Sequence, residues 1–263
     1  YATIDLTQTQ YDRYYRGFCN TTLWPLFHYL TDRFRYDHEW HAGYRDVNRW
    51  FAERLVPLLR PDDRLWIHDY HLIPLARELR SLGVRQRIGL FLHIPFPHIE
   101  VLRLLPPYEE LIRNLTHYDL VGFQTAADEK SFHAGLGGVF PEGAPLVKTG
   151  SFPIGIDVDG VIAEASGAMR TEPVKRMIAG LIGRRLMIGV DRLDYSKGLV
   201  ERFTAYQRFL ERHAARRGRL IYLQIAPLSR DDIQAYVTIR EALEQATGRT
   251  NGRFADTDWT PLR

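Results

Sequence analysis

The stretch LMIGVDRLDYSKGLVERFTAYQRFLERH, residues 186–213, decides the class of fold to which this sequence belongs. Its first part, Leu186–Val190, is a short apolar run that predicts a buried strand. Its last part, Leu199–His213, has the apolar spacing of an amphipathic helix, and a polar loop joins the two. A strand, a short loop and a helix in this order form the repeating unit of a parallel sheet with crossover helices.

The same unit recurs along the rest of the chain. Four more short apolar runs predict strands, and they are Leu65–Tyr70, Ile88–Ile94, Leu120–Gln124 and Leu220–Ala226. The amphipathic stretches between them predict helices, and these are Val47–Leu59, Leu72–Leu82, Tyr108–Thr116 and Ile233–Ala246. We therefore predict an α/β fold that is doubly wound around mostly parallel sheets.

A change of composition near the middle predicts two domains. The segment GLGGVFPEGAPLVKTGS, Gly135–Ser151, is rich in Gly, Pro and small residues and predicts a loop that interrupts the alternation. After Pro153–Asp157 a new series of helices and strands begins. We expect a first domain over residues 1–155 and a second over residues 156–263.

The composition is that of a globular protein, with 45% hydrophobic and 25% charged residues. No run of about eighteen apolar residues occurs, so we expect no membrane-spanning helix. The net charge of +3 does not indicate a nucleic-acid-binding protein, because Lys and Arg are interleaved with Asp and Glu. We expect the densest basic stretch to lie solvated at a helix C-terminus, and it consists of Arg212, Arg216, Arg217 and Arg219.

The single cysteine and the two ends of the sequence add two expectations. Cys19 has no partner for an intrachain disulfide and no signal peptide begins the sequence, so we expect a cytoplasmic protein. The sequence begins at Tyr1 without a methionine and stops at Arg263 without a helix cap. We expect both ends to be cuts within a longer protein.

Polar residues follow every predicted strand, at the edge where open parallel sheets bind ligands. In the second half, Arg192 and Lys197 flank a loop that opens a helix at Gly198, and Arg230 stands at the start of another helix. Fixed cations beside helix N-termini favour phosphate. These three side chains predict a site for a diphosphate and a separate monophosphate.

The first half offers a histidine-rich strand end with two interpretations. His68 and His71 with Asp69 between them could ligate a metal, but side chains three apart on a strand point to opposite faces, and nothing completes the site. We favour a hydrogen-bonding role for Asp69 in a cleft, with His68 packed at the sheet's edge. His93 is either a core histidine or a neutral partner of a sugar hydroxyl.

The aromatic residues near the start of the chain also leave two interpretations open. Tyr15 and Trp24 stand in segments crowded with aromatic residues but without a strict helical period. Core packing explains most of these residues. A Trp or Tyr at the mouth of a cleft is also the usual platform for a sugar ring.

Eight segments together closely resemble one family, the trehalose-6-phosphate synthases. They are LWPLFHY, WIHDYHLIPLA, IGLFLHIPFP, YDLVGFQT, PIGID, DRLDYSKGL, ERFTAYQRFL and IAPLSRDDIQAY, in the family's order across nearly the whole chain. The resemblance implies a GT-B-like fold, with two Rossmann-like domains facing a cleft and the second one incomplete. It also implies a retaining transfer of glucose from UDP-glucose to glucose 6-phosphate, giving α,α-trehalose 6-phosphate and UDP.

For the donor, the resemblance implies that Arg192 and Lys197 contact the diphosphate and act as the main electrostatic catalysts. It implies that His93 holds the glucose of the nucleotide sugar. No protein nucleophile, general base, metal or cofactor is implied, and UDP-glucose is a substrate. The leaving phosphate is expected to take the acceptor's proton.

For the acceptor, the resemblance implies that Tyr15 and Arg230 hold the phosphate of glucose 6-phosphate and that Asp69 binds its hydroxyls. Trp24 and Ile94 are expected to shape the acceptor pocket and to select the α-anomer. The family's N-terminal Gly-rich loop and its C-terminal acidic segment do not occur in these residues. We therefore expect the 263 residues alone to bind substrates weakly.

Two other functions fit the same residues. A related pseudo-glycosyltransferase couples a nucleotide-cyclitol to a phosphorylated acceptor, and a non-catalytic regulatory homologue would bind a sugar phosphate. The sequence fits UDP, ADP and GDP donors alike, either a monomer or a homo-oligomer, and a protein with or without a following phosphatase domain. The partners that we expect are small-molecule substrates.

Overall fold

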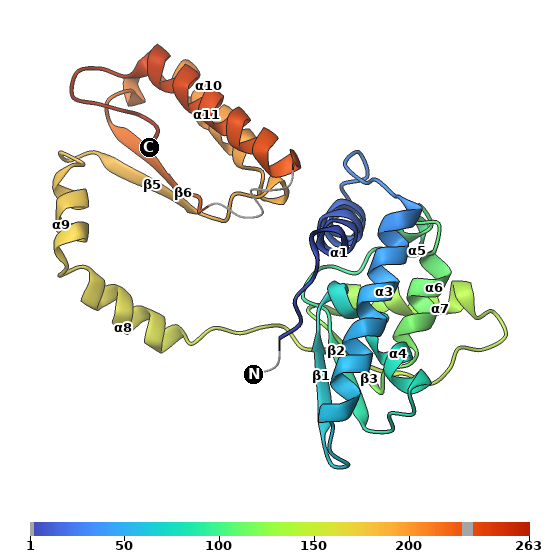
Figure 1. Cartoon of the computed structure of the whole chain (residues 1–263). Helices are drawn as coiled ribbons and strands as arrows, with labels where there is room; N and C mark the ends of the chain where they lie inside the picture. Colours follow the sequence, from blue (N-terminus) through green and yellow to red (C-terminus); the bar gives the residue numbers. More distant parts are fainter. Residues whose placement is uncertain (1–2, 228–233) are drawn as a thin grey trace. The chain divides into compact units, whose positions relative to one another are not determined.

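The computed structural model describes residues 3–227 and 234–263 of the chain. These residues form two compact units, Tyr1–Gly155 and Ile156–Arg263. Each unit contains its own parallel sheet (Figure 1). None of the helices within the described ranges combines the length and the apolar character that crossing a bilayer requires.

The sheet of the first unit has four parallel strands in the order β1-β2-β3-β4. The strands are β1 (Arg64–His68), β2 (Arg87–Phe91), β3 (Leu120–Phe123) and β4 (Lys148–Ser151). His68 lies opposite Phe91 in the register, and Phe91 lies opposite Gly122. The carboxyl ends of β1, β2 and β3 are therefore level, and the polar residues that follow them meet at one edge.

Three boundary predictions in and around this sheet were wrong. The first two strands end earlier than expected, at His68 and Phe91, because Asp69 leaves the extended conformation with φ 73° and β2 ends before the rigid Pro95. The segment expected as a loop over Gly135–Ser151 holds the end of a helix and all of β4. Lys148–Ser151 lacks an apolar run and extends because it pairs with β3.

Three helices of the first unit overlap predicted helices with shifted ends, and two further helices, Ile99–Leu102 and Ala126–Val139, were not predicted. In chain order, these helices are α3 (His38–Leu55), α4 (Leu75–Ser81), α5 (Ile99–Leu102), α6 (Tyr108–Leu115) and α7 (Ala126–Val139), with 3-10 turns η2 (Val56–Leu58) and η3 (Tyr70–Leu72). α3 begins earlier than predicted because the Asp37 side chain caps it, accepting from the Glu39 N–H at 2.7 Å.

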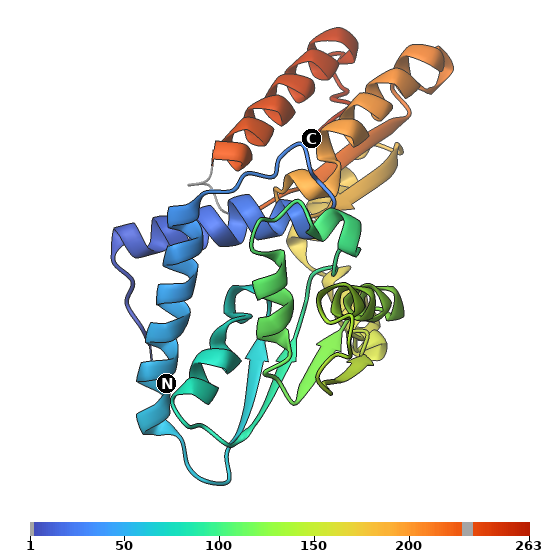
Figure 2. The ribbon, with the colours of Figure 1, turned by 90° about the vertical axis from the view of Figure 1, so that its right-hand side faces the viewer.

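One long helical segment precedes these helices and carries two of the candidate site residues. It runs through α1 (Gln8–Tyr11), the π-helix η1 (Asp12–Leu23) and α2 (Trp24–Phe27). The segment crosses α3 and packs against it (Figure 2). π-helical stretches are rare in proteins, and those that occur lie frequently at functional sites.

The second unit has a two-stranded parallel sheet covered by two long helices. Its elements are α8 (Val158–Ala168), α9 (Glu172–Ala179), β5 (Arg185–Val190), η4 (Tyr195–Lys197), α10 (Leu199–Arg212), η5 (Ala214–Arg216), β6 (Leu220–Ile225) and α11 (Gln234–Phe254). Arg212 is the last residue of α10, and Arg217 donates from Nε to the Leu210 carbonyl at 2.9 Å. The basic stretch therefore lies at the C-terminus of a helix, as predicted.

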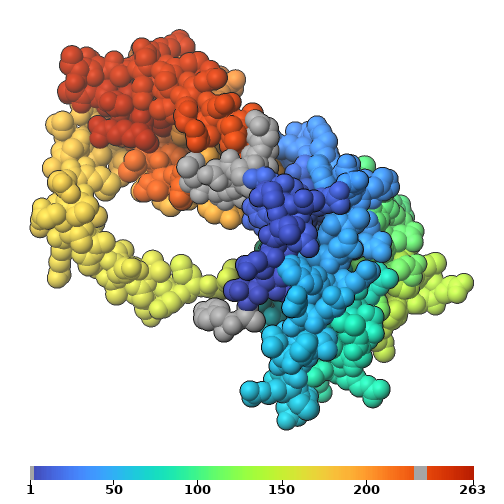
Figure 3. Space-filling view, viewed as in Figure 1, coloured from blue at the N-terminus to red at the C-terminus, as the bar shows by residue number. Residues whose placement is uncertain are grey.

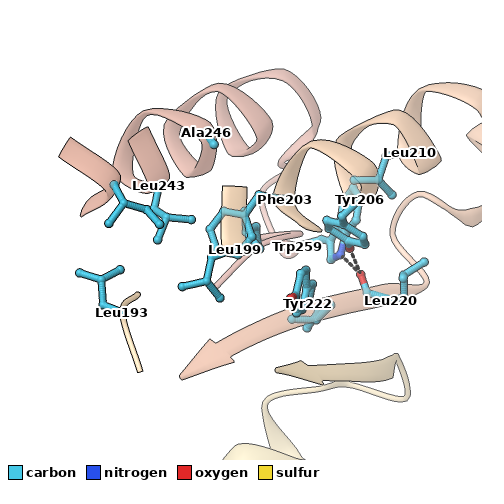
Figure 4. Close-up of a cluster of buried hydrophobic side chains, with 13 residues drawn as sticks. Leu193, Leu199, Phe203, Tyr206, Leu210, Leu220, Tyr222, Leu243, Ala246 and Trp259 are labelled. Atoms are coloured by element: carbon cyan, nitrogen blue, oxygen red, sulfur yellow. Dashed lines mark hydrogen bonds between the residues drawn. The ribbon is translucent and has the colours of Figure 1, made fainter. Parts of the chain in front are cut away.

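The core of the second unit lies between α10, α11 and β6 (Figure 4). Trp259 donates from Nε1 to the Leu220 carbonyl at 2.8 Å, and the Tyr206 hydroxyl contacts the same carbonyl at 3.4 Å. Burial raises the pKa of Tyr206 to about 12. The C-terminal residues Pro261–Arg263 lie beside β6, where the Tyr222 N–H donates to the Pro261 carbonyl at 2.8 Å.

The first two helices of the second unit contribute nothing to this core. No residue of α8 or α9 is buried, and Val158, Ile162 and Ile178 are among their exposed apolar side chains. In the space-filling view α8 forms a narrow ridge that no other residue of its unit covers on the face shown (Figure 3). The hydrophobic stability of this unit therefore comes from the cluster around α10, α11 and β6.

Candidate functional site

A strained residue marks the end of β1. Asp69 has φ 73° and ψ 170°, a conformation that a non-glycine residue adopts only at a cost of about 1–3 kcal/mol. Its N–H donates to the Phe91 carbonyl at 2.8 Å, and its Oδ1 accepts from the His93 N–H at 3.2 Å. The positive φ therefore turns the carboxylate towards the residues that follow β2.

The two histidines at this edge contact each other directly. Nδ1 of His68 lies 2.9 Å from Nε2 of His93, and the two rings stack with centroids 5.2 Å apart. Both side chains are exposed. His68 ends the edge strand β1, and its ring packs on the rings of Trp66 and His93, as expected for a residue at the sheet's edge, although it is exposed. The interpretation of His93 as a buried core histidine was wrong, because His93 is exposed.

The turn after Asp69 is held by buried tyrosines from the neighbouring helices. The Tyr14 hydroxyl donates to the His71 carbonyl at 3.2 Å, and the Tyr44 hydroxyl donates to the Tyr70 carbonyl at 2.6 Å. Burial raises the pKa of both Tyr14 and Tyr44 well above the ordinary value, so both stay neutral donors. Tyr15 stacks on the ring of His71, with centroids 5.7 Å apart, which brings Tyr15 to the same turn.

Trp24 and Ile94 lie in the walls around this turn. Trp24 is 5% exposed and packs against His28 and Tyr70, with ring centroids 4.1 Å and 5.9 Å away. Ile94 follows His93 directly and is 6% exposed. Both side chains are therefore core residues of the first unit. They lie beside the strand-end edge, which is the edge of the sheet formed by the carboxyl ends of β1, β2 and β3.

Sequence reasoning missed Asp128, which holds the segment after β2. The Asp128 carboxylate accepts from the Phe96 N–H at 2.9 Å and from the Thr125 hydroxyl at 2.5 Å. Thr125 in turn caps α7 by accepting from the Asp128 N–H. The Thr-x-x-Asp spacing just before α7 is a capping signal that could have identified this pair.

In the second unit the loop between β5 and α10 presents two cations. The side chains of Arg192 and Lys197 are exposed, and neither makes a hydrogen bond or an ion pair with any residue in the described part of the chain. Gly198 has φ 62°, a left-handed conformation that glycine adopts without strain, and α10 begins directly after it. The loop therefore brings two cations to a helix N-terminus, as predicted.

Four side chains that the sequence analysis did not single out fix the shape of this loop. Arg202 donates to the Asp191 carboxylate at 2.7 Å and to the Lys197 carbonyl at 2.9 Å, and the bond to Asp191 raises the pKa of Arg202. Buried Asp194 accepts from the Ser196 N–H at 2.9 Å and from the Tyr236 hydroxyl at 3.1 Å. The carboxylates of the loop are thus occupied internally, which leaves its positive charge to an external anion.

Two of the earlier expectations concern other parts of the chain. Arg230, predicted to hold a phosphate, lies outside the described residues. Among the residues that the structure does describe, no group of three or more His, Cys, Asp or Glu side chains is arranged to hold a metal ion.

Comparison with known proteins gives matches over the whole chain. The model of glycosyltransferase family 20 matches residues 1–263. The trehalose-6-phosphate synthase of Sinorhizobium fredii is 45% identical over 273 residues, which cover 100% of this chain and 59% of that protein. The trehalose-6-phosphate synthase of Sodalis glossinidius is 45% identical over 272 residues, which cover 100% of this chain and 58% of that protein.

Solved structures match equally well. The UDP-forming alpha,alpha-trehalose-phosphate synthase from Burkholderia xenovorans in complex with glucose-6-phosphate is 48% identical, with a TM-score of 0.94 over 99% of this chain and 60% of that one. The E. coli protein bound with UDP-2-fluoro glucose is 42% identical, with a TM-score of 0.91 over 98% of this chain and 59% of that one. These matches confirm the predicted α/β fold class. The chain spans about 59% of the length of the Sinorhizobium fredii protein.

Proposed function

The chain belongs to glycosyltransferase family 20, as its sequence motifs indicated, and from this premise we propose that the whole protein is a retaining glucosyltransferase. It would transfer glucose from UDP-glucose to glucose 6-phosphate and release α,α-trehalose 6-phosphate and UDP. The support comes from relatives that are trehalose-6-phosphate synthases and from solved structures of two of them, one with glucose-6-phosphate and one with UDP-2-fluoro glucose. We also propose a cytoplasmic location.

The observation that carries this proposal is the pair of exposed cations after β5, whose side chains form no ion pair with any residue that the structure describes. As the bond from the glucose C1 to the diphosphate breaks, negative charge develops on the leaving UDP. Arg192 and Lys197 would lie against that diphosphate, and each charge-assisted hydrogen bond contributes roughly 1.5–3 kcal/mol. Because Arg202 and Asp194 already hold the loop, little reorganisation is needed when the charge appears.

The strand-end edge of the first unit would hold the sugars. Asp69 presents a carboxylate that can accept hydrogen bonds from acceptor hydroxyls. His93 would bind a hydroxyl of the donor glucose, since its ring is exposed beside Asp69. Both assignments rest on the geometry of the edge and on the family's motifs.

The remaining roles concern the acceptor. Tyr15 would contact the phosphate of glucose 6-phosphate together with Arg230. Trp24 and Ile94, both buried beside the edge, would form the rigid wall that selects the α-anomer. A wall of packed core residues discriminates well, because it cannot move aside without disturbing the core.

The bond changes need no protein nucleophile. The C1–O bond of UDP-glucose breaks, a bond forms between C1 and the anomeric oxygen of glucose 6-phosphate on the same face, and the hydroxyl proton passes to the leaving phosphate. We propose that the protein acts by positioning the two sugars and by neutralising the diphosphate, with no metal or organic cofactor.

The test uses the full-length protein with glucose 6-phosphate and, separately, UDP-, ADP- and GDP-glucose. The expected result is α,α-linked trehalose 6-phosphate, identified by NMR, with UDP-glucose as the best donor. Nucleotide binding without this product would reject the proposal and favour a cyclitol-coupling enzyme or a regulatory sugar-phosphate-binding protein instead.

A further inference from the structure

Four rings form a cluster at the end of β1 and β2. Trp66 meets His68 edge to face at 5.6 Å, and Phe91 meets His93 edge to face at 4.8 Å. The cluster is closed by the contact between Trp66 and Phe91 at 6.3 Å and by the stacked pair His68 and His93. The ring of His93 is therefore contacted from two sides by residues of its own strand end and of the neighbouring one.

The backbone under His93 is also fixed from both sides. The Leu92 N–H donates to the Gly122 carbonyl at 2.9 Å, which ties it to β3. The His93 N–H donates to the Asp69 carboxylate at 3.2 Å, which ties it to the end of β1. Once the backbone is fixed, the orientation of the His93 ring depends on its side-chain contacts.

The hydrogen bond between the two histidines constrains the protons of both. Of the two nitrogens that meet, Nδ1 of His68 and Nε2 of His93, one must carry the hydrogen and the other must accept it. Nε2 of His93 is thus occupied, and Nδ1 of His93 makes no hydrogen bond to any residue within 3–227 or 234–263. The second nitrogen of a histidine that is oriented by a neighbour is the one that meets a ligand.

We propose that His68 is a positioning residue, which orients the ring of His93 so that Nδ1 of His93 meets a hydroxyl of the bound sugar. This inference rests on the proposed function for the sugar, but the orientation of His93 is a property of the protein alone. The two tautomers of the pair make Nδ1 of His93 either a donor or an acceptor, and a sugar hydroxyl can pair with both.

Exposure of the pair argues against a role in folding alone. Both rings are exposed, and a hydrogen bond between exposed groups adds little stability, because water competes for each partner. Precise orientation of a polar group towards a ligand, in contrast, benefits directly from a side-chain bond of this kind.

The experiment compares two substitutions of His68 in the full-length protein. His68→Phe keeps an aromatic ring that can stack on His93 but removes the hydrogen bond. His68→Asn places an amide close to the position of Nδ1, and an amide can donate or accept. The matched control is His133→Phe, because His133 is also exposed and bonded to a side chain, the Thr149 hydroxyl at 2.9 Å, but lies away from the edge.

Two measurements are made on each variant. Nitrogen-15 NMR of the histidine rings reports the tautomer of His93, and steady-state kinetics report kcat and KM for each substrate. We expect His68→Phe to alter the His93 ring signals and to lower kcat/KM for the nucleotide sugar about five- to tenfold, with KM for glucose 6-phosphate unchanged. His68→Asn and His133→Phe should retain the wild-type values.

Three results would overturn the inference. The His93 signals could be unchanged in His68→Phe, the donor kcat/KM could be unchanged in the same variant, or His68→Asn could lose as much as His68→Phe. If the wild-type protein forms no trehalose 6-phosphate, the proposed function fails. The NMR comparison of His68→Phe with His68→Asn then still decides whether His68 orients His93.

Discussion

Replacing Asp69 by alanine and by glycine isolates the backbone strain at the end of β1. Both variants lose the carboxylate and its bond to the His93 N–H, so their difference depends on the backbone alone. At φ 73° and ψ 170° alanine keeps a strain of about 1–3 kcal/mol, which glycine does not have. Glycine loses roughly 0.5–1 kcal/mol through its greater freedom in the unfolded chain.

We therefore expect Asp69→Gly to be more stable than Asp69→Ala, by up to about 2.5 kcal/mol and by about 1 kcal/mol at the middle of both ranges, the reverse of the usual order. Urea unfolding followed by tryptophan fluorescence suits the test, because Trp24, Trp40, Trp50 and Trp66 lie in the first unit. Only the unfolding transition of the first unit needs to be resolved, since a protein of two units need not unfold in one step.

An ordinary helical position provides the control. Ser81, the last residue of α4, should show the usual order, with Ser81→Ala more stable than Ser81→Gly by about 0.5–1 kcal/mol. Both Asp69 variants should also lose turnover, because neither retains the carboxylate proposed to bind the acceptor. If alanine at position 69 exceeds glycine in stability as it does at position 81, the reasoning about strain is refuted.

Three further predictions concern the second unit. Arg192→Ala should lower kcat of the full-length protein by a factor on the order of 10² or more, with an unchanged circular dichroism spectrum. Arg212→Ala, at the end of α10, should leave kcat unchanged. A well-folded, active Arg192→Ala enzyme would contradict the mechanism. Arg202→Met removes the partner of Asp191. Because this ion pair is partly exposed, we expect the free energy of unfolding to fall by about 1 kcal/mol or less, but kcat/KM for the nucleotide sugar to fall roughly tenfold. Kinetics equal to those of the wild type would show that the loop needs no support from Arg202. Burial raises the pKa of Tyr206 to about 12, so near pH 10 the unfolded chain ionises this group while the folded chain keeps it protonated, and the free energy of unfolding should fall between about pH 10 and 12. In thermal melts, Tyr206→Phe should show a smaller fall over this range. An identical pH profile for the two proteins would show that burial does not raise the pKa of Tyr206.

The local pattern of the sequence was sufficient for the central elements. β3, β5, β6 and α10 have nearly the predicted ends, because their apolar residues follow one period and are enclosed by turn residues. β4 was missed for the opposite reason. Its residues carry no apolar run, and it is a strand because β3 offers a free edge with unpaired N–H and C=O groups.

The candidate site divides in the same way. Arg192 and Lys197 could be found from the sequence, because they flank a short loop between a clear strand and a clear helix. The partners that shape the site could not be found, since Arg202 reaches back to Asp191 across a turn and only the folded loop shows the contact.

By itself the sequence determined the α/β alternation, the family and the pair of cations before α10, because each depends on residues close together in the chain. Only the tertiary structure decided that Asp69 takes a positive φ and that His68 contacts His93. These features depend on two strands that are distant in sequence and level in the sheet, and the register of a parallel pair is set by packing of the whole unit. The contacts between side chains of a site at a sheet edge therefore depend on the assembled sheet.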